Sequence, residues 1–159
     1  MFQPGRRATM LQTKGARSMP ENKAVVFRWV DELWNKGNLA IVDELGAPAI
    51  KVYYPLTGEL RGHDQVRRGV ARLRSSFPDI SFSPEGEVIG EGDYVAARWR
   101  AQATQQGALG SVPATGKPVS WMGISVFRLI EGKILEEIGE EDALSILEQL
   151  GVIPKQKLQ

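Results

Sequence analysis

The chain has 159 residues, of which 42% are hydrophobic and 25% are charged. This length and composition predict one folded domain that is large enough to bury a core and keep a pocket. Twenty basic and nineteen acidic residues give a formal net charge of +1, and no basic surface indicates a nucleic-acid partner. No apolar run approaches the roughly 20 residues that a membrane-spanning helix requires, so we expect no membrane partner.

The sequence contains no cysteine and one histidine, His63. These counts exclude a disulfide, a thiol nucleophile, a cysteine metal site and a multi-histidine metal site. No serine lies in a G-x-S-x-G nucleophile elbow, which disfavours Ser/His/Asp hydrolysis. The lack of cysteine is compatible with a reducing, cytoplasmic location. His63 stands at the start of a predicted helix and is interpreted as a neutral surface residue.

The chain divides into a folded domain and two tails. Residues 1–19 are basic, lack acidic residues and show no apolar period, which predicts a flexible tail or an over-long start. This segment also lacks the apolar stretch of a secretory signal. We expect the folded domain over residues 20–153 and a short C-terminal tail over residues 154–159.

The first half of the domain shows mainly helical periodicity. Apolar residues recur at spacings of three and four in two segments, which predicts helices over about 21–36 and 64–76. Between them the pattern predicts a short helix through Leu45 and a strand over 50–54. A turn-rich stretch follows the strand through Gly62.

After Pro78 the apolar period becomes two. Turn residues separate four segments that read as an antiparallel meander, at about 79–90, 94–106, 118–130 and 133–139. A final helix is predicted over about 143–150. This order predicts an α+β fold, a cone-shaped curved antiparallel sheet with three to four helices on one face enclosing a pocket.

Five segments carry a family resemblance. They are ENKAVVFRWVDELWNKGNLAIVDEL (21–45), VAARW (95–99), VPATGKPVSW (112–121), VFRLIEGKILEE (126–137) and EDALSILEQLG (141–151). In this order they resemble the SnoaL-like polyketide cyclases of the nuclear transport factor two-like superfamily. The resemblance implies a cone fold, a hydrophobic small-molecule ligand, no metal or cofactor, and a homodimer paired through the outer sheet face. The best-understood members close a polyketide ring by an aldol step.

The resemblance also implies a role for Asp142, because these cyclases place an acid/base aspartate just before the last helix. A carboxylate in a dry pocket has a raised pKa and can transfer protons near neutral pH. The alternative is that Asp142 caps the last helix. The chain departs from the family pattern at three places, where Gln105, Tyr53-Tyr54 and Ile138 replace a histidine, an Asp-His pair and a tryptophan.

Aromatic and amide side chains are the candidates for the pocket wall. Trp99 shares a strand face with Gln105, because side chains two apart point the same way; the alternative is a core tryptophan. On the next strand we favour the inward face that carries Trp121 and Phe127. The remaining candidates are a tryptophan at a position where relatives place a pocket tyrosine, and two tyrosines of which one should point into the hollow: Trp29, Tyr53 and Tyr54.

Three functions are compatible with these residues. The first is a cofactor-independent enzyme acting on a hydrophobic, carbonyl-bearing molecule, in which Asp142 exchanges a proton and Gln105 with a tyrosine holds the substrate oxygen. The second is a non-catalytic binding protein with the same pocket. The third is an epoxide hydrolase-like site that needs Arg98 or Arg100 in the pocket, and it ranks last because both lie on the face opposite Trp99.

Overall fold

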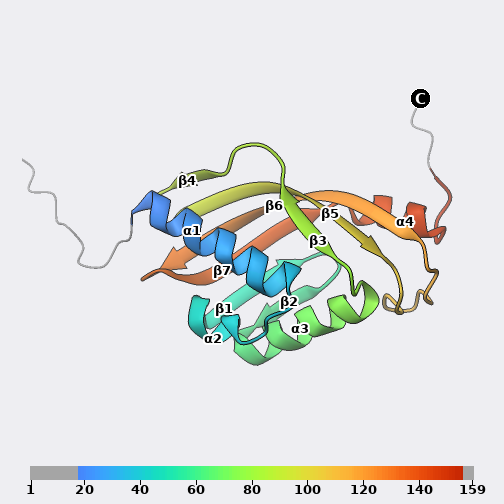
Figure 1. Ribbon diagram of the computed structural model, residues 1–159, viewed down its shortest axis with the longest axis horizontal. Helices are drawn as coiled ribbons and strands as arrows, with labels where there is room; N and C mark the ends of the chain where they lie inside the picture. Colours follow the sequence, from blue (N-terminus) through green and yellow to red (C-terminus); the bar gives the residue numbers. More distant parts are fainter. Residues whose placement is uncertain (1–17, 156–159) are drawn as a thin grey trace, which may run out of the picture.

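A strongly curved sheet arches over a layer of helices (Figure 1). The computed structural model describes residues 18–155, so residues 1–17 of the tail predicted over 1–19, and residues 156–159, lie outside the described residues. Met19, at the end of that predicted tail, is the first residue of a helix. The elements in chain order are α1 (Met19–Trp29), the π-helix η1 (Val30–Asn35), α2 (Ile41–Leu45), β1 (Gly46–Tyr54), β2 (Gly58–Arg61), α3 (Gly62–Ser76), β3 (Ser81–Pro84), β4 (Ile89–Glu91), β5 (Tyr94–Thr104), β6 (Pro118–Ile130), β7 (Lys133–Glu141) and α4 (Ala143–Leu150).

Helix α1 begins with a capping box. The backbone N–H of Ser18 donates to the carboxylate of Glu21 at 2.7 Å, which satisfies an amide that has no partner within the helix. The predicted helix over 21–36 is confirmed, but its second half is wound as a π-helix. No helix within residues 18–155 is long and apolar enough to cross a membrane.

The sheet has the strand order β2-β1-β7-β6-β5-β3, with β4 also paired to β5. All neighbours are antiparallel except β1 and β7, which run parallel. The sheet is therefore mixed, while the predicted meander of its second half is confirmed. Two details went unpredicted: β2 has only one buried apolar residue, Leu60, to mark it, and the segment over 79–90 is divided into β3 and β4 at Pro84 and Gly86.

The long strand β6 separates a buried face from an exposed one. Trp121 and Phe127 are buried against the helices, which confirms the predicted inward face. The intervening apolar residues Met122, Ile124 and Val126 are 41–45% exposed. The concave face of the sheet thus holds the core and the pocket, and its convex face carries an uncovered apolar stripe.

Candidate functional site

The pocket lies between helix α1, the π-helix η1 and the concave face of the sheet. Its cavity volume is about 70 Å³, which is room for a few water molecules. Helices, strands and the turn after β1 contribute side chains to its lining, and the aromatic residues among them are Phe27, Trp34, Tyr54, Phe82, Trp99 and Phe127. Two carboxylates, Glu137 and Glu141, also line this otherwise largely apolar space.

Glu137 is the buried centre of the site, with 1% of its surface exposed. The indole of Trp29 donates to its Oε2 at 2.7 Å. The indole of Trp34 and the hydroxyl of Tyr54 donate to its Oε1 at 3.0 and 2.6 Å. Burial raises the pKa of Glu137 to about 7, although these three hydrogen bonds favour the ionised form. A carboxyl with this pKa exchanges protons readily near neutral pH.

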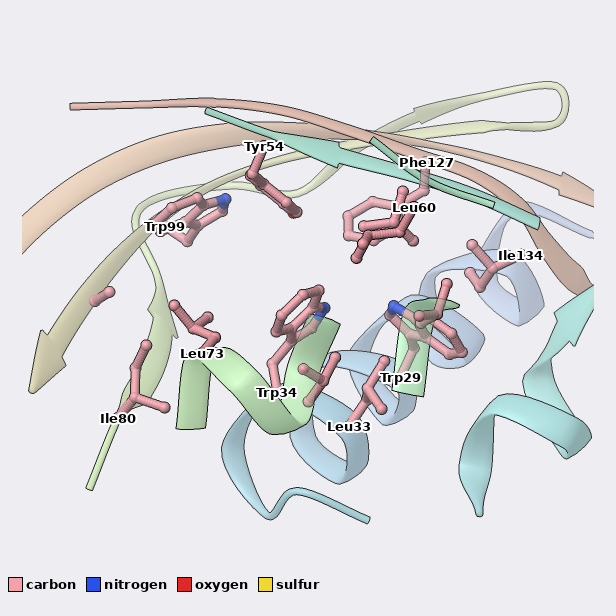
Figure 2. Packing of buried hydrophobic residues seen from close by; sticks show 14 of the residues in the cluster. Trp29, Leu33, Trp34, Tyr54, Leu60, Leu73, Ile80, Trp99, Phe127 and Ile134 are labelled. Carbon is pink, nitrogen blue, oxygen red and sulfur yellow. The ribbon is translucent and has the colours of Figure 1, made fainter. Parts of the chain in front are cut away.

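The π-helix explains how two tryptophans reach one carboxylate. Trp29 and Trp34 are five residues apart, and in an α-helix that spacing would turn their side chains about 140° away from each other. In η1 the turn is widened, as shown by the bond from the Lys36 N–H to the Asp31 carbonyl at 3.0 Å. Residues five apart then share a face, and both indoles point toward the sheet (Figure 2).

Hydroxyl groups continue the hydrogen-bond chain from Glu137 across the sheet. The Tyr54 hydroxyl lies 2.6 Å from Ser125 Oγ on β6. The indole of Trp99 donates to the same oxygen at 2.7 Å. Figure 2 shows Tyr54 and Trp99 side by side on the sheet, above Trp34. The chain of contacts therefore joins Trp99, Ser125, Tyr54 and Glu137 in one row.

Two glycines make room for these aromatic rings. A Cβ on Gly139 of β7 would overlap the ring of Tyr54, and a Cβ on Gly123 of β6 would overlap the indole of Trp99. Both glycines stand on the inward face of the sheet. The rings can therefore approach the backbone of neighbouring strands closely, while their polar atoms form the hydrogen bonds of the network.

Glu141 forms a second carboxylate site, four residues beyond Glu137 on β7. The backbone N–H of Leu56 donates to its Oε1 at 3.0 Å, and the indole of Trp121 donates to its Oε2 at 3.1 Å. Burial again raises the pKa, as the largest cause. All four tryptophans of the chain thus donate their indole N–H to a side-chain oxygen of a residue that lines the pocket.

Of the residues predicted for the site, Tyr54, Trp99 and Phe127 line the pocket. Trp29 and Trp121 lie behind it and hold the two carboxylates. Tyr53 is half-buried and turned to the other face of β1.

Gln105 is placed elsewhere than predicted. It is buried, but its Nε2 donates to the Pro113 carbonyl and its Oε1 accepts from the N–H and hydroxyl of Thr115. These hydrogen bonds hold the loop after β5, and Gln105 is not among the residues that line the pocket.

Asp142 is exposed and caps helix α4, since its carboxylate accepts from the Ser145 N–H at 2.9 Å. It is not among the residues that line the pocket. Of the two arginines considered for an epoxide hydrolase-like site, Arg98 belongs to the pocket lining but is exposed, and Arg100 pairs with Glu85 at 2.7 Å. Within residues 18–155 no arginine forms an ion pair with Glu137 or Glu141.

The sequence gives little signal for Glu137, because a bulge changes which residues of β7 face inward. Arg128 pairs with Glu136 while the next residue, Leu129, pairs with Ile134, so Leu135 is an extra residue. Simple alternation from the buried Ile134 would turn Glu137 outward. Ser125 was not predicted as a site residue. It lies on the inward face of β6 between Trp121 and Phe127, where the two aromatic side chains were the candidates.

Comparisons with known proteins agree with this fold. Residues 24–150 match the family described as SnoaL-like polyketide cyclase. Over 93 residues, 58% of this chain, the sequence is 31% identical to the aklanonic acid methyl ester cyclase DnrD of Streptomyces peucetius. The match covers 64% of DnrD, so the chain spans less than two thirds of that relative.

Two solved structures extend the likeness to nearly the whole fold. A candidate SnoaL-like polyketide cyclase from Jannaschia sp. CCS1 has a TM-score of 0.78 and 26% identity, with 87% of this chain and 98% of that one covered. AclR, a candidate hydroxylase from Streptomyces galilaeus, has a TM-score of 0.75 and 29% identity, with 88% and 87% covered. Because the family match includes most of the chain, this protein belongs to the SnoaL-like polyketide cyclase family.

Proposed function

We propose that this protein is a cofactor-independent enzyme of the cyclase or isomerase type, with Glu137 as its acid/base group. Membership of the family and the likeness to DnrD support a cyclase-type function. The single observation that carries the proposal is a buried carboxylate, with a pKa of about 7, in the wall of the pocket. Enolate chemistry needs one group that takes a proton from carbon and returns a proton to oxygen.

The proposed substrate is hydrophobic and bears a carbonyl group. Aromatic side chains make up much of the lining, and rings such as those of Trp34 and Trp99 bind flat apolar molecules well. The cavity of about 70 Å³ is below the roughly 300 Å³ of an ordinary small-molecule pocket. We therefore expect only the reacting end of the substrate to enter, or the walls to part around it.

Glu137 replaces Asp142 as our candidate for the acid/base group. The Asp142 carboxylate is exposed and already accepts a backbone hydrogen bond as a helix cap. Glu137 is buried, lines the pocket and is held in a fixed orientation by three donors. Desolvation gives it the properties that the sequence led us to expect at Asp142.

A non-catalytic binding protein is the second candidate. The position of Asp142 favours it, since the aspartate expected to act in catalysis serves as a helix cap. The fold by itself does not decide between the two, because one fold supports many chemistries. Turnover is therefore the property to test.

The test compares Glu137→Gln with Asp142→Asn in the full chain. Aklanonic acid methyl ester, the compound named for DnrD, and simple aromatic β-keto esters serve as probes, and products are followed by chromatography. We expect turnover by the wild type and by Asp142→Asn, and a loss of at least about 100-fold in Glu137→Gln. A loss of turnover in Asp142→Asn alone would instead assign the acid/base role to Asp142. Saturable binding without turnover would support the binding protein.

We further propose a homodimer formed through the convex face of the sheet. The stripe of Met122, Ile124 and Val126 on β6 is apolar and uncovered, and burial of such a stripe against a second copy would stabilise a dimer. Light scattering on Ile124→Glu and on wild type tests this. The variant should be monomeric, and a wild-type protein that is itself monomeric would refute the dimer.

A further inference from the structure

The hydrogen atoms in the row from Trp99 to Glu137 have only one arrangement when Glu137 is ionised. Indole N–H groups donate and never accept, and an ionised carboxylate only accepts. Tyr54 has one hydrogen, and it is given to Glu137 at 2.6 Å. The contact between Tyr54 and Ser125 must then be donated by Ser125, whose oxygen accepts from Trp99.

Protonation of Glu137 reverses the direction of the hydrogen bonds that join Glu137, Tyr54 and Ser125. The new O–H needs an acceptor, and Trp29 and Trp34 offer none. Among its hydrogen-bond partners only the Tyr54 oxygen can accept. Tyr54 must then turn its own hydrogen to Ser125, which already accepts from Trp99. The hydrogen of Ser125 is left to point into the pocket that it lines.

We propose that Ser125 and Tyr54 form a reversible proton relay, in which the Ser125 hydroxyl delivers the proton of Glu137 to the substrate oxygen and takes it back. This inference rests on the proposed function, because it assigns the point at which that acid/base group meets the substrate. Ser125 is then the group in contact with the carbonyl, and Tyr54 acts between it and Glu137.

The proton transfer balances without any further reactant. The Ser125 proton passes to a lone pair of the substrate oxygen, the Tyr54 proton passes to Ser125, and the Glu137 proton passes to Tyr54. Glu137 is left ionised and the substrate oxygen protonated. The reverse sequence returns the substrate proton to Glu137 when the hydroxyl becomes a carbonyl again.

The surroundings of Glu137 contain few other charges. Helix α1 and η1 present the uncharged indoles of Trp29 and Trp34, β1 presents Tyr54, and β6 presents Ser125. On β7 itself, Glu141 is near enough for its charge to raise the pKa of Tyr54. Arg98 belongs to the lining but is exposed. Within residues 18–155, no lysine, arginine or histidine forms an ion pair with Glu137 or Glu141.

The four indole N–H groups allow the relay to be tested without a substrate. In nitrogen-15 NMR spectra of the full chain, each tryptophan should give one indole signal. The test follows these signals from pH 5 to pH 9. Trp29 and Trp34 report directly on Glu137, and Trp121 reports on Glu141. Trp99 contacts neither carboxylate. If the row reverses, the Trp99 signal shifts with the same midpoint as Trp29 and Trp34.

Tyr54→Phe breaks the row and leaves Glu137 in place. We expect the signals of Trp29 and Trp34 to keep titrating, with a higher midpoint because one donor to the carboxylate is lost, while Trp99 stops responding. Tyr53→Phe, at the next position but on the other face of β1, is the matched control and should leave all four titrations unchanged. Ser125→Ala is the second variant, and it should also abolish the pH-dependent shift of the Trp99 signal.

Continued titration of Trp99 with Glu137 in Tyr54→Phe would show a direct effect of charge and overturn the relay. A flat Trp99 signal in the wild type would overturn it as well. Failure of the relay and failure of the proposed function are distinct. A coupled Trp99 in a protein without turnover refutes only the enzyme, and turnover with an uncoupled Trp99 refutes only the relay.

Discussion

The ring of Tyr54 on β1 lies against Gly139 on β7, where any side chain on the glycine would overlap it. We predict that Gly139→Ala displaces Tyr54 and lowers the free energy of unfolding by about 1 to 3 kcal/mol, the usual cost of overpacking. Urea unfolding measures the loss. A double-mutant cycle with Tyr54→Ala is the control, since the alanine at 139 should cost much less once the ring is gone.

Burial of Glu137 predicts that the protein becomes less stable as the pH rises. The pKa of Glu137 is about 7 in the folded protein and 4.5 as the model value. Between these values the folded state holds a proton that the unfolded state has lost, so this contribution is complete below pH 4.5 and disappears as the pH passes 7. It amounts to at most about 3 kcal/mol. The raised pKa of Glu141 acts in the same direction.

Unfolding by urea at pH 5, 6, 7 and 8 measures this dependence. In Glu137→Gln the difference in stability between pH 5 and pH 8 should shrink. Glu136→Gln is the matched control, because the carboxylate of Glu136 is half-exposed and its Oε2 lies 4.0 Å from Nη1 of Arg128. An equal pH dependence in wild type and Glu137→Gln would contradict the prediction.

The two indoles that hold Glu137 predict a separate shift in its pKa. Each donates to the carboxylate and favours its ionised form. We therefore expect Trp29→Phe and Trp34→Phe each to raise the pKa of Glu137, by about one to two units, the equivalent of one hydrogen bond to a charged group. Carbon-detected NMR of the glutamate carboxyls gives the value. Trp121→Phe is the control and should act on Glu141 instead.

The amide of Gln105 predicts the behaviour of the loop after β5. Gln105→Ala removes its hydrogen bonds to Pro113 and Thr115, so we expect a loss of about 1 to 3 kcal/mol and faster amide exchange at Thr115. The adjacent Gln106 has an exposed side chain, and Gln106→Ala should change neither property. Probe binding in the pocket should survive in both variants, and its loss in Gln105→Ala alone would place the amide in ligand recognition.

Much of the fold could be predicted from the sequence because periodicity follows burial directly. Helix α4 and strand β6 have the predicted bounds, and the aromatic face of β6 is the buried one. The parallel contact of β1 with β7 could not be predicted in this way. It joins strands that are far apart in the chain, and no local pattern encodes that pairing.

The site was predictable only in its aromatic part. Tyr54, Trp99 and Phe127 follow from alternation along their strands. Glu137 does not, since the bulge at Leu135 reverses the alternation of β7. The π-helix is equally hidden, because the apolar spacing of its residues fits an α-helix. A site that depends on a bulge to place its carboxylate and on a π-helix to place the indoles that hold it leaves no simple trace in the sequence.

The narrow pocket also has a kinetic consequence. Its cavity of about 70 Å³ is well below the roughly 300 Å³ of an ordinary small-molecule pocket. Entry then depends on how often α1 and the segment around Pro84 move apart, both of which line the cavity. Association should be slower than the roughly 10⁵ to 10⁷ M⁻¹s⁻¹ of complexes that need no rearrangement, and nearly independent of ionic strength for an uncharged ligand. A ligand that has entered would leave equally slowly, so long residence rather than fast capture would account for its affinity.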